Sequence, residues 1–169
     1  MDTEKVNSVF IGLGSNIGNR TEFISSVIKE ISIAGNCKIK AISSLYESLP
    51  FGDIEQENFF NAVIKVETNL DHFSLLEKLN EIEQKLGRVK RERWGPREID
   101  IDILFFNDLI FSDEIITLPH KGVIYRDFVL VPLCEIEPEF VHPVYNKKIC
   151  DFIVDLKQKN IIRKIQFYQ

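Results

Sequence analysis

Hydrophobic and polar residues alternate along several segments of the chain, and other segments repeat hydrophobic residues at helical spacing. Alternation with a period of two is typical of strands with one buried face, whereas apolar positions three and four apart indicate amphipathic helices. The first half of the chain predicts strands at Val6–Gly14, Lys38–Glu47 and Phe60–Thr68, and helices at Arg20–Ala34 and between Asp71 and Gly87. The second half predicts a strand from Ile99 through Phe106, a hairpin at Leu109–Thr117, helices at Arg126–Ile136 and Ile149–Lys157, and an edge strand at Ile161–Tyr168.

The order of the first six elements is β-α-β-β-α-β, the split βαβ arrangement. This order predicts an α+β fold with a ferredoxin-like core, in which helices pack on a mainly antiparallel sheet as a three-layer α/β/α sandwich. The chain has 169 residues, of which 44% are hydrophobic. This length and composition suit one domain over residues 1–169.

The strand after residue 98 carries two acids on one face. Isoleucines occupy its other face, at Ile99, Ile101 and Ile103. Asp100 and Asp102 would stand about 6.6 Å apart along the strand, close enough to share metal ions. We expect Leu104 and Phe106 to continue the acid face with apolar groups, so that the acids lie at the rim of a buried region. The alternative is a solvated strand face, the commoner setting for acids that alternate with isoleucine.

A cluster of basic residues precedes this strand. Within ten positions the chain places Arg88, Lys90, Arg91, Arg93 and Arg97. Mg²⁺ is usually held by one or two carboxylates together with substrate phosphates, and arginine binds phosphate oxygens through its planar guanidinium fork. The cluster and the acids together favour a phosphorylated substrate, although a solvated basic loop is the alternative.

The overall charge limits the classes of partner. The net charge is -5 and the isoelectric point is near 5.3, which disfavours a general nucleic-acid or membrane surface. The three cysteines lack the paired spacing of a zinc site or a disulfide framework, and buried thiols in a reducing cytoplasm are expected. No apolar run approaches the length of a membrane span, and no targeting segment is apparent.

Two glycine-containing loops frame possible ligand sites. The segment from Gly12 to Gly18 matches neither the dinucleotide fingerprint nor a Walker loop, so its glycines are interpreted as turn formers at a strand exit. The segment from Ser48 to Asn58 is too long for a tight hairpin, and loops of this length often act as lids.

Several of these pieces together resemble one family, 6-hydroxymethyl-7,8-dihydropterin pyrophosphokinase, over most of the chain from residue 8 to about residue 140. The motifs that carry the resemblance are Gly14-Ser15-Asn16, Asn58-Phe59-Phe60-Asn61-Ala62, Gly87-Arg88, Arg93-Trp94-Gly95-Pro96-Arg97 with Asp100-Ile101-Asp102, Pro119-His120, and Arg126 through Phe128. The Arg-Trp-Gly-Pro-Arg run followed by the aspartate pair is highly specific, whereas each other motif alone is weak.

The resemblance implies transfer of pyrophosphate from ATP to the hydroxymethyl group of a reduced pterin, with release of AMP, in folate biosynthesis. It also implies two Mg²⁺ ions as cofactors, held by Asp100 and Asp102, with Arg88 and Arg97 binding phosphates. The expected partners are ATP and the pterin, with no nucleic acid and no membrane. The enzyme is expected to be a cytoplasmic monomer.

Further positions match the family's nucleotide and pterin contacts. For ATP these are Asn80, Glu83, Trp94, His120 and Arg126. For the pterin, Phe59 and Phe128 are similar to an aromatic pair that sandwiches the ring, and Asn61 to an amide that reads its edge. The alternatives are core aromatics, a strand-end amide and an ordinary loop histidine.

Lys121 departs from the family pattern, which often has tyrosine after the histidine. The basic loop is also one residue shorter than in some members, so Lys90 and Arg91 cannot be assigned individually.

Two other classes of protein remain as alternatives. Split βαβ sheets often bind RNA, but the acidic isoelectric point and the lack of an RNP-like aromatic signature weigh against an RNA-binding module. A metal-dependent phosphohydrolase would use the same acids without a pterin.

Overall fold

The computed structural model describes residues 6–52, 55–91 and 95–166 of the chain. Arg93 and Trp94, which the sequence assigned to the basic loop, lie outside the described residues. The helices of the described part are α1 (Arg20–Ile33), α2 (His72–Lys85) and α3 (Asp127–Ile136), with 3₁₀ helices η1 (Val123–Tyr125) and η2 (Ile149–Asp155). The strands are β1 (Asn7–Ser15), β2 (Cys37–Ile42), β3 (Leu45–Ser48), β4 (Phe59–Thr68), β5 (Asp100–Phe106), β6 (Phe111–Ser112), β7 (Thr117–Leu118), β8 (Val141–His142), β9 (Lys147–Lys148) and β10 (Ile161–Ile165).

The main sheet has six strands in the order β10-β3-β4-β1-β5, and β2 also pairs with β4. All of its pairings are antiparallel. The strand β1 lies between β4 and β5 and is almost fully buried. The predicted antiparallel sheet is confirmed.

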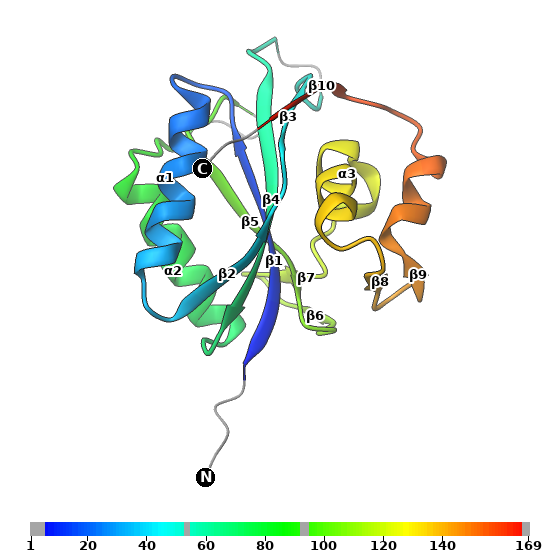
Figure 1. Cartoon of the computed structure of the whole chain (residues 1–169). Helices are drawn as coiled ribbons and strands as arrows, with labels where there is room; N and C mark the ends of the chain where they lie inside the picture. Colours follow the sequence, from blue (N-terminus) through cyan, green and yellow to red (C-terminus); the bar gives the residue numbers. More distant parts are fainter. Residues whose placement is uncertain (1–5, 53–54, 92–94, 167–169) are drawn as a thin grey trace.

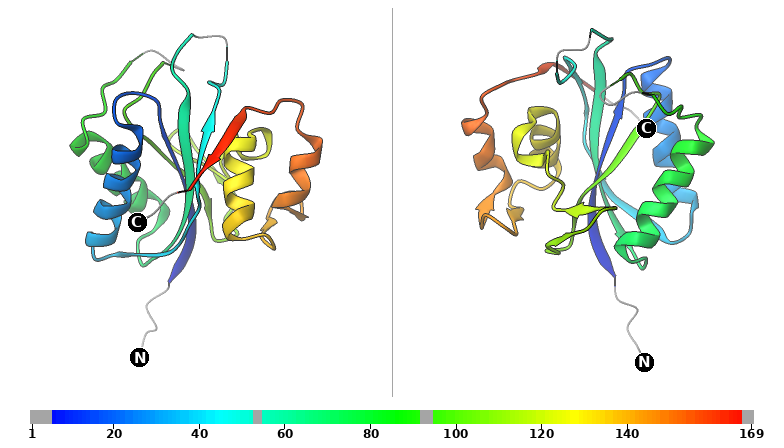
Figure 2. Two further views of the ribbon diagram at one scale, coloured as in Figure 1. Left: turned by 45° about the horizontal axis from the view of Figure 1, so that its top comes forward. Right: turned by 180° about the vertical axis from the view of Figure 1, so that it is seen from behind.

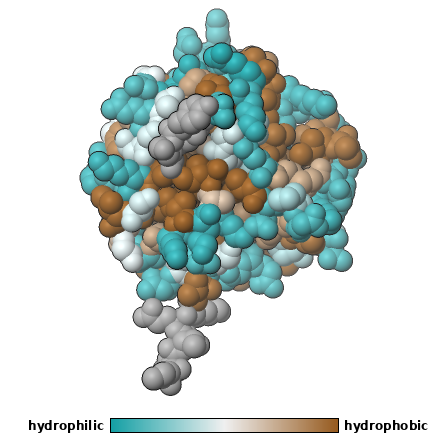
Figure 3. Space-filling view, in the orientation of Figure 1, coloured by the Kyte–Doolittle hydropathy of each residue, from teal (hydrophilic) through white to brown (hydrophobic). Residues whose placement is uncertain are grey.

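Helices cover both faces of the sheet, with α1 and α2 on one side and α3 with η2 on the other (Figures 1 and 2). Each face has its own apolar core. The core on the α1 and α2 side includes Ile11, Ile24 and Leu79, and the core on the α3 side includes Phe10 and Leu130. The three-layer α/β/α sandwich is therefore confirmed. On the face shown in Figure 3, hydrophobic side chains gather in the middle, surrounded by hydrophilic surface.

Local sequence signals explain where the first two helices begin and end. The side chain of Asn19 accepts a hydrogen bond from Glu22 N, and that of Asp71 accepts from Phe73 N and Ser74 N. Such caps satisfy backbone donors that have no partner inside the helix. Gly87 follows α2 with a φ of 86°, a left-handed conformation that glycine adopts without strain.

The predicted strand at Lys38–Glu47 is in fact two strands, β2 and β3, which both pair with β4. The break lies at Ser43 and Ser44. The Ser43 hydroxyl accepts from Val63 N, and the carboxylate of Glu135 on α3 accepts from Ser44 N. Ser43 N still donates to Val63 O, but the side chains of Ser43 and Glu135 supply the other acceptors at this break, where α3 approaches the strand.

The expectation that Phe106 continues the face of Asp100 and Asp102 is wrong. Leu104 lies on that face and belongs to the α3-side core, but Phe106 packs in the opposite core. The pairing of β1 with β5 shifts register between Phe10 and Ile11, opposite Leu104. A bulge of this kind adds a residue to one strand and reverses the alternation beyond it.

Two smaller expectations also need correction. The segment predicted as a helix at Ile149–Lys157 is the 3₁₀ helix η2. The three cysteines are free thiols, as expected, but each is partly exposed rather than buried. Among the described residues, no helix is long and apolar enough to cross a bilayer.

Candidate active site

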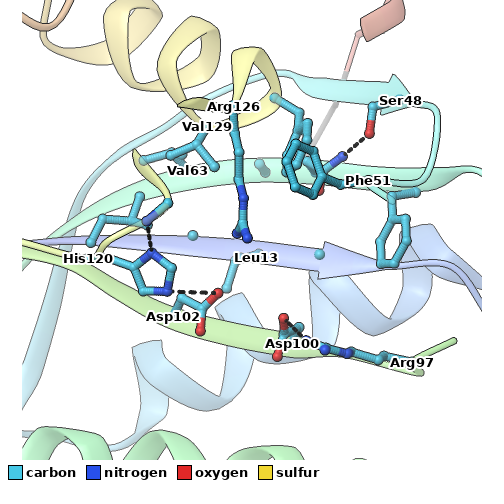
Figure 4. A pocket seen from close by; sticks show the side chains of 18 of the residues that line it. Leu13, Ser48, Phe51, Val63, Arg97, Asp100, Asp102, His120, Arg126 and Val129 are labelled. Carbon is cyan, nitrogen blue, oxygen red and sulfur yellow. Dashed lines mark hydrogen bonds and ion pairs between the residues drawn. The ribbon is translucent and has the colours of Figure 1, made fainter. Parts of the chain in front are cut away.

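A cavity of about 550 Å³ opens on the α3 side of the sheet, at the end where β1 and β3 finish and β4 and β5 begin. It is lined by residues from four strands, the loop after β3, η1 and the start of α3. Eight of the predicted site residues line it: Phe59, Asn61, Arg97, Asp100, Asp102, His120, Arg126 and Phe128. Segments that are far apart in the sequence thus meet at one end of the sheet (Figure 4).

The two aspartates of β5 face this cavity together, as the strand alternation predicted. The Asp100 carboxylate is paired with arginines on both oxygens. Arg97 Nη1 lies 2.5 Å from Oδ2, and Arg88 Nη1 lies 3.0 Å from Oδ1. The basic segment before the strand therefore neutralises the first acid.

Among the residues that the structure describes, no cation lies as close to Asp102 as the arginines lie to Asp100. His120 Nε2 lies 3.9 Å from its Oδ2, and 40% of the side chain is exposed, toward the cavity. Surrounding protein disfavours the charged form, and the nearby Asp100 adds like-charge repulsion. Together they raise the pKa of Asp102 from 3.8 to about 7, with Arg126 and Arg97 opposing the shift. Within the described residues, no group of three or more His, Cys, Asp or Glu side chains forms a metal site.

Glu83 and Asn80, on α2, do not line the cavity. Glu83 is buried, its Oε1 accepts a hydrogen bond of 2.7 Å from Ile101 N, and it forms an ion pair with Arg88. Burial raises the pKa of Glu83, and the charge of Arg88 opposes the rise. Glu83 thus lies behind Arg88 and holds it against β5. Asn80 is exposed on α2.

His120 lies beside β5, where its backbone N donates to Leu104 O at 2.9 Å, and Arg126 reaches into the cavity from the α3 side (Figure 4). His120 Nδ1 accepts a hydrogen bond from Gly122 N at 3.1 Å, and burial lowers the pKa of the ring. The neutral ring therefore carries its proton on Nε2, toward Asp102. A side chain at Gly122 would meet Arg126 Cζ at 2.7 Å, so the guanidinium packs directly over this glycine. Burial lowers the pKa of Arg126, and the aspartate charges partly offset the effect.

Aromatic and amide side chains line the part of the cavity formed by β3, the loop after it, the start of β4 and the start of α3, which we call the aromatic end. The buried Asn61 donates from Nδ2 to Ser48 Oγ at 2.8 Å. The Phe51 and Phe128 ring centroids are 6.5 Å apart in an edge-to-face arrangement. Phe59 also lines the cavity, so the side chains expected to bracket a flat ring are all present. Their role in binding stays a prediction.

Asn16 joins the loops on either side of the cavity. Its Oδ1 accepts from Arg97 N at 2.8 Å, and its Nδ2 donates to Gln56 Oε1 and Glu57 O. The side chain therefore fixes the end of the basic segment against the loop that follows β3. This explains in physical terms why an asparagine stands after Gly14 and Ser15.

Several lining residues were not among the sequence-predicted site residues. They include Ser48, Phe51, Lys121 and Gly122. Phe51 lies in the loop that the sequence indicated as a lid, so its position was the available signal. Ser48 carried no signal, because its role depends on the pairing of β3 with β4.

A smaller cavity of about 290 Å³ adjoins the first and shares Asp102, His120 and Lys121 with it. Its remaining walls are mostly apolar and come from α2, β5 and the segment around β7: Leu76, Ile101, Ile103, Ile115, Ile116 and Thr117. Asp102 thus stands between a larger cavity with aromatic walls and a smaller apolar cavity.

Comparison with known proteins gives a consistent family. Residues 10–138 match the family 7,8-dihydro-6-hydroxymethylpterin-pyrophosphokinase (HPPK). A 2-amino-4-hydroxy-6-hydroxymethyldihydropteridine pyrophosphokinase of Aquifex aeolicus is 41% identical over 145 residues, covering 86% of this chain and 89% of the relative. The enzyme of the same name from Haemophilus influenzae is 40% identical over 80% of this chain and 85% of its own length.

Longer proteins also contain a matching region. The folic acid synthesis protein fol1 of Pneumocystis carinii is 44% identical over 91% of this chain, which spans 21% of the relative's length. Wild-type Plasmodium falciparum HPPK-DHPS, solved with pteroate, superimposes with a TM-score of 0.72 at 19% identity, covering 89% of this chain and 42% of that chain. At this identity the structural likeness supports the fold alone. The sequence matches show that the chain belongs to the 7,8-dihydro-6-hydroxymethylpterin-pyrophosphokinase family.

Proposed function

We propose that the cavity at the end of the sheet is the active site for the family's reaction, with Asp100 and Asp102 at its centre. As a member of this family, the chain transfers pyrophosphate from ATP to the hydroxymethyl group of 6-hydroxymethyl-7,8-dihydropterin, releasing AMP, in folate biosynthesis. The observation that carries the site assignment is the pair of carboxylates that face one cavity together with two arginines and several aromatic side chains.

The donor set of this site fits Mg²⁺. Hard divalent cations prefer oxygen ligands and are commonly held by one or two carboxylates plus substrate phosphates. Removal from water and the neighbouring Asp100 charge raise the pKa of Asp102, and a cation bound here would offset both effects. Asp100 and Asp102 would hold two ions, which would supply electrostatic stabilisation of the phosphates. The dependence on Mg²⁺ and the number of ions are part of this proposal.

Arginines on the chain would hold the triphosphate. Arg88 and Arg97 pair with Asp100 in this structure. A bound nucleotide would offer these arginines phosphate oxygens, and the two carboxylates would then bind metal cations instead. Arg126, whose buried guanidinium favours an anion nearby, would approach the phosphates from the opposite wall. Neutral His120 would donate from Nε2 into the same space. These groups would stabilise charge that develops during in-line attack on the β-phosphorus.

The smaller apolar cavity suits the adenine and ribose. It adjoins Asp102 and His120, so a nucleotide whose phosphates lie at these residues could place its base against the apolar walls. We assign Asn80, Glu83 and Trp94 to the nucleotide side as well. Glu83 would act by holding Arg88, rather than by touching ATP.

The aromatic end of the cavity would bind the pterin. Phe59 and Phe128 offer apolar faces to a flat ring, and Asn61 offers an amide to its polar edge. The hydrogen bond from Asn61 Nδ2 to Ser48 fixes the orientation of that amide. No dedicated general base is assigned. The loops around residues 48–58 and 88–98 would close over both substrates and exclude water that would otherwise hydrolyse ATP.

We also propose that residues 1–169 form a single domain that works as a cytoplasmic monomer, with no nucleic-acid or membrane partner. The support for one domain is that η2 and β10, which follow the matched residues 10–138, pack on α3 and on β3.

One assay tests the function and separates it from the alternatives. The protein is incubated with ATP, Mg²⁺ and the hydroxymethyl dihydropterin, and AMP is measured with and without the pterin. We expect AMP only when the pterin is present. Release of inorganic phosphate without pterin would favour a phosphohydrolase, and salt-sensitive RNA binding without turnover would favour an RNA-binding module.

Asp102→Asn tests the metal assignment in the same assay. We expect turnover to fall by about 10²- to 10³-fold or more, because a group that stabilises the transition-state charge is lost. Asp155→Asn, an exposed acid on η2, is the matched control and should be fully active. Unchanged AMP production by Asp102→Asn would rule out the proposed role of this carboxylate.

A further inference from the structure

Asp127, the first residue of α3, is a buried acid that lies outside the cavity. Its side chain is 3% exposed, and no ion pair of the described residues involves it. Its oxygens instead accept three backbone hydrogen bonds. Oδ1 accepts from Phe128 N at 2.8 Å, and Oδ2 accepts from Asn160 N at 2.7 Å and from Ile161 N at 2.8 Å.

These bonds fasten the C-terminal segment to the start of α3. Both Arg126 and Phe128, which flank Asp127, line the cavity. The segment that Asp127 holds leads from η2 back to the sheet, where β10 runs beside β3 (Figures 1 and 2). Residues 160–165 follow the part of the chain that matches the family, residues 10–138.

The same C-terminal segment also holds the opposite wall of the aromatic end. Asn160 O accepts from Leu49 N at 2.9 Å, and Ile161 pairs with Ser48 across the β10-β3 ladder. The Ser48 hydroxyl in turn accepts from Asn61 Nδ2. A continuous chain of contacts therefore runs from Phe128, through Asp127 and the C-terminal segment, to Asn61.

We propose that Asp127 is a positioning residue for the pterin end of the site, which sets the separation between the Phe128 wall and the wall formed by Ser48 and Asn61. This inference rests on the proposed function, because it assumes that these walls bind the pterin. Among the described residues, no side-chain hydrogen bond or ion pair joins this chain of contacts to Asp100, Asp102, Arg88 or Arg97, and of the proposed phosphate-binding groups Arg126 alone adjoins it, as the residue before Asp127. Asp127 therefore controls pterin binding far more than ATP binding.

A carboxylate suits this position better than an amide. Both oxygens of Asp127 accept from backbone N–H groups. An asparagine has one acceptor oxygen, so its NH₂ group would face either Phe128 N–H or the two N–H groups of the C-terminal segment. Because leaving buried donors unpaired is costly, the segment would shift and the cavity walls with it.

The test compares Asp127→Asn and Asp127→Ala with the intact enzyme, measuring KM for the pterin, KM for ATP, and kcat. We expect KM for the pterin to rise by about tenfold or more. The reason is that losing one hydrogen bond to a charged group typically changes an equilibrium constant by about this factor. KM for ATP should change by less than about threefold. Ser48→Ala interrupts the same chain of contacts elsewhere and should also raise KM for the pterin selectively, which covers the case in which both Asp127 variants fail to fold.

Leu133→Ala is the matched control. Leu133 is fully buried on the same helix but does not line the cavity, so its truncation should lower stability without changing either KM. Unaltered pterin KM in the folded variants, or equal rises for pterin and ATP, would overturn the positioning role. If the intact enzyme made no pterin-dependent AMP, the proposed function itself would fail, which is a separate outcome.

Discussion

Asp102 and Asp100 stand on the same face of β5 but differ in their electrostatic surroundings. The Asp102 carboxylate is open to the cavity but enclosed on its other sides by protein, and this desolvation together with the charge of Asp100 raises its pKa from 3.8 to about 7. Asp100 differs because Arg88 and Arg97 pair with it directly. Two acids two positions apart therefore have different electrostatic surroundings, and the less compensated one is the better candidate to need a cation.

This difference predicts a pH-dependent stability. An acid whose pKa is higher in the folded protein than in the unfolded chain binds protons more tightly when folded. Without Mg²⁺ and nucleotide, Asp102 should therefore lower the free energy of unfolding by a growing amount as the pH rises from about 4 to about 7. Asp102→Asn removes this cost, so the variant should gain stability relative to the original protein over this range, as measured by urea unfolding at pH 5 and pH 8.

The control for this experiment is Asp155→Asn, whose carboxylate is exposed on η2. This variant shows how much of any difference comes from removing an acidic side chain far from the cavity. A difference between Asp102→Asn and the original protein that stayed constant between pH 5 and pH 8 would contradict the raised pKa.

At the scale of elements, the sequence predicted the ends of a helix or strand correctly where neighbouring residues supply the hydrogen bonds. The helix α2 begins after Asp71 and ends before Gly87, as predicted, because a cap and a left-handed turn involve only neighbouring residues. The break between β2 and β3 could not be predicted in this way. It depends on Glu135, which is 91 residues away from Ser44 in the sequence and reaches it only when α3 packs on the sheet.

The cap of α2 gives a prediction at this scale. Asp71→Ala removes the acceptor of two backbone N–H groups and should reduce the free energy of unfolding by about 1 kcal/mol, as measured by urea denaturation. Asp71 is exposed and does not line the cavity, so KM and kcat should stay unchanged. Asp71→Asn, which keeps a capping oxygen, should recover most of the lost stability. Equal losses for alanine and asparagine would argue against the cap.

At the scale of the whole molecule, the sheet brings together residues from distant parts of the chain. Asn61 on β4 and Asp102 on β5 line one cavity because antiparallel pairing aligns the ends of their strands, and Arg126 joins them because α3 packs on the same face of the sheet. Ligands that bridge these walls should therefore stabilise the entire fold rather than one segment.

Ligand-dependent unfolding tests this expectation. ATP with Mg²⁺, at about a hundred times its dissociation constant, should raise the melting temperature by roughly 5–10 °C. Chelation of Mg²⁺ by EDTA should remove most of this increase, and Asp102→Asn should show little of it. An equal increase with and without Mg²⁺ would contradict the joint binding of metal and nucleotide. Sedimentation of the same samples tests whether the protein is a monomer.

The sequence by itself determined the order of elements, the helix ends and the alternation that puts Asp100 and Asp102 on one face, because each follows from spacing along a local segment. It also carried the motifs of the family. Only the tertiary structure decided that Arg88 pairs with Asp100, that Phe106 turns to the opposite core, and that Asp127 holds the C-terminal segment. The physical reason is that these contacts join residues whose distance is set by sheet pairing and helix packing, which no local spacing specifies.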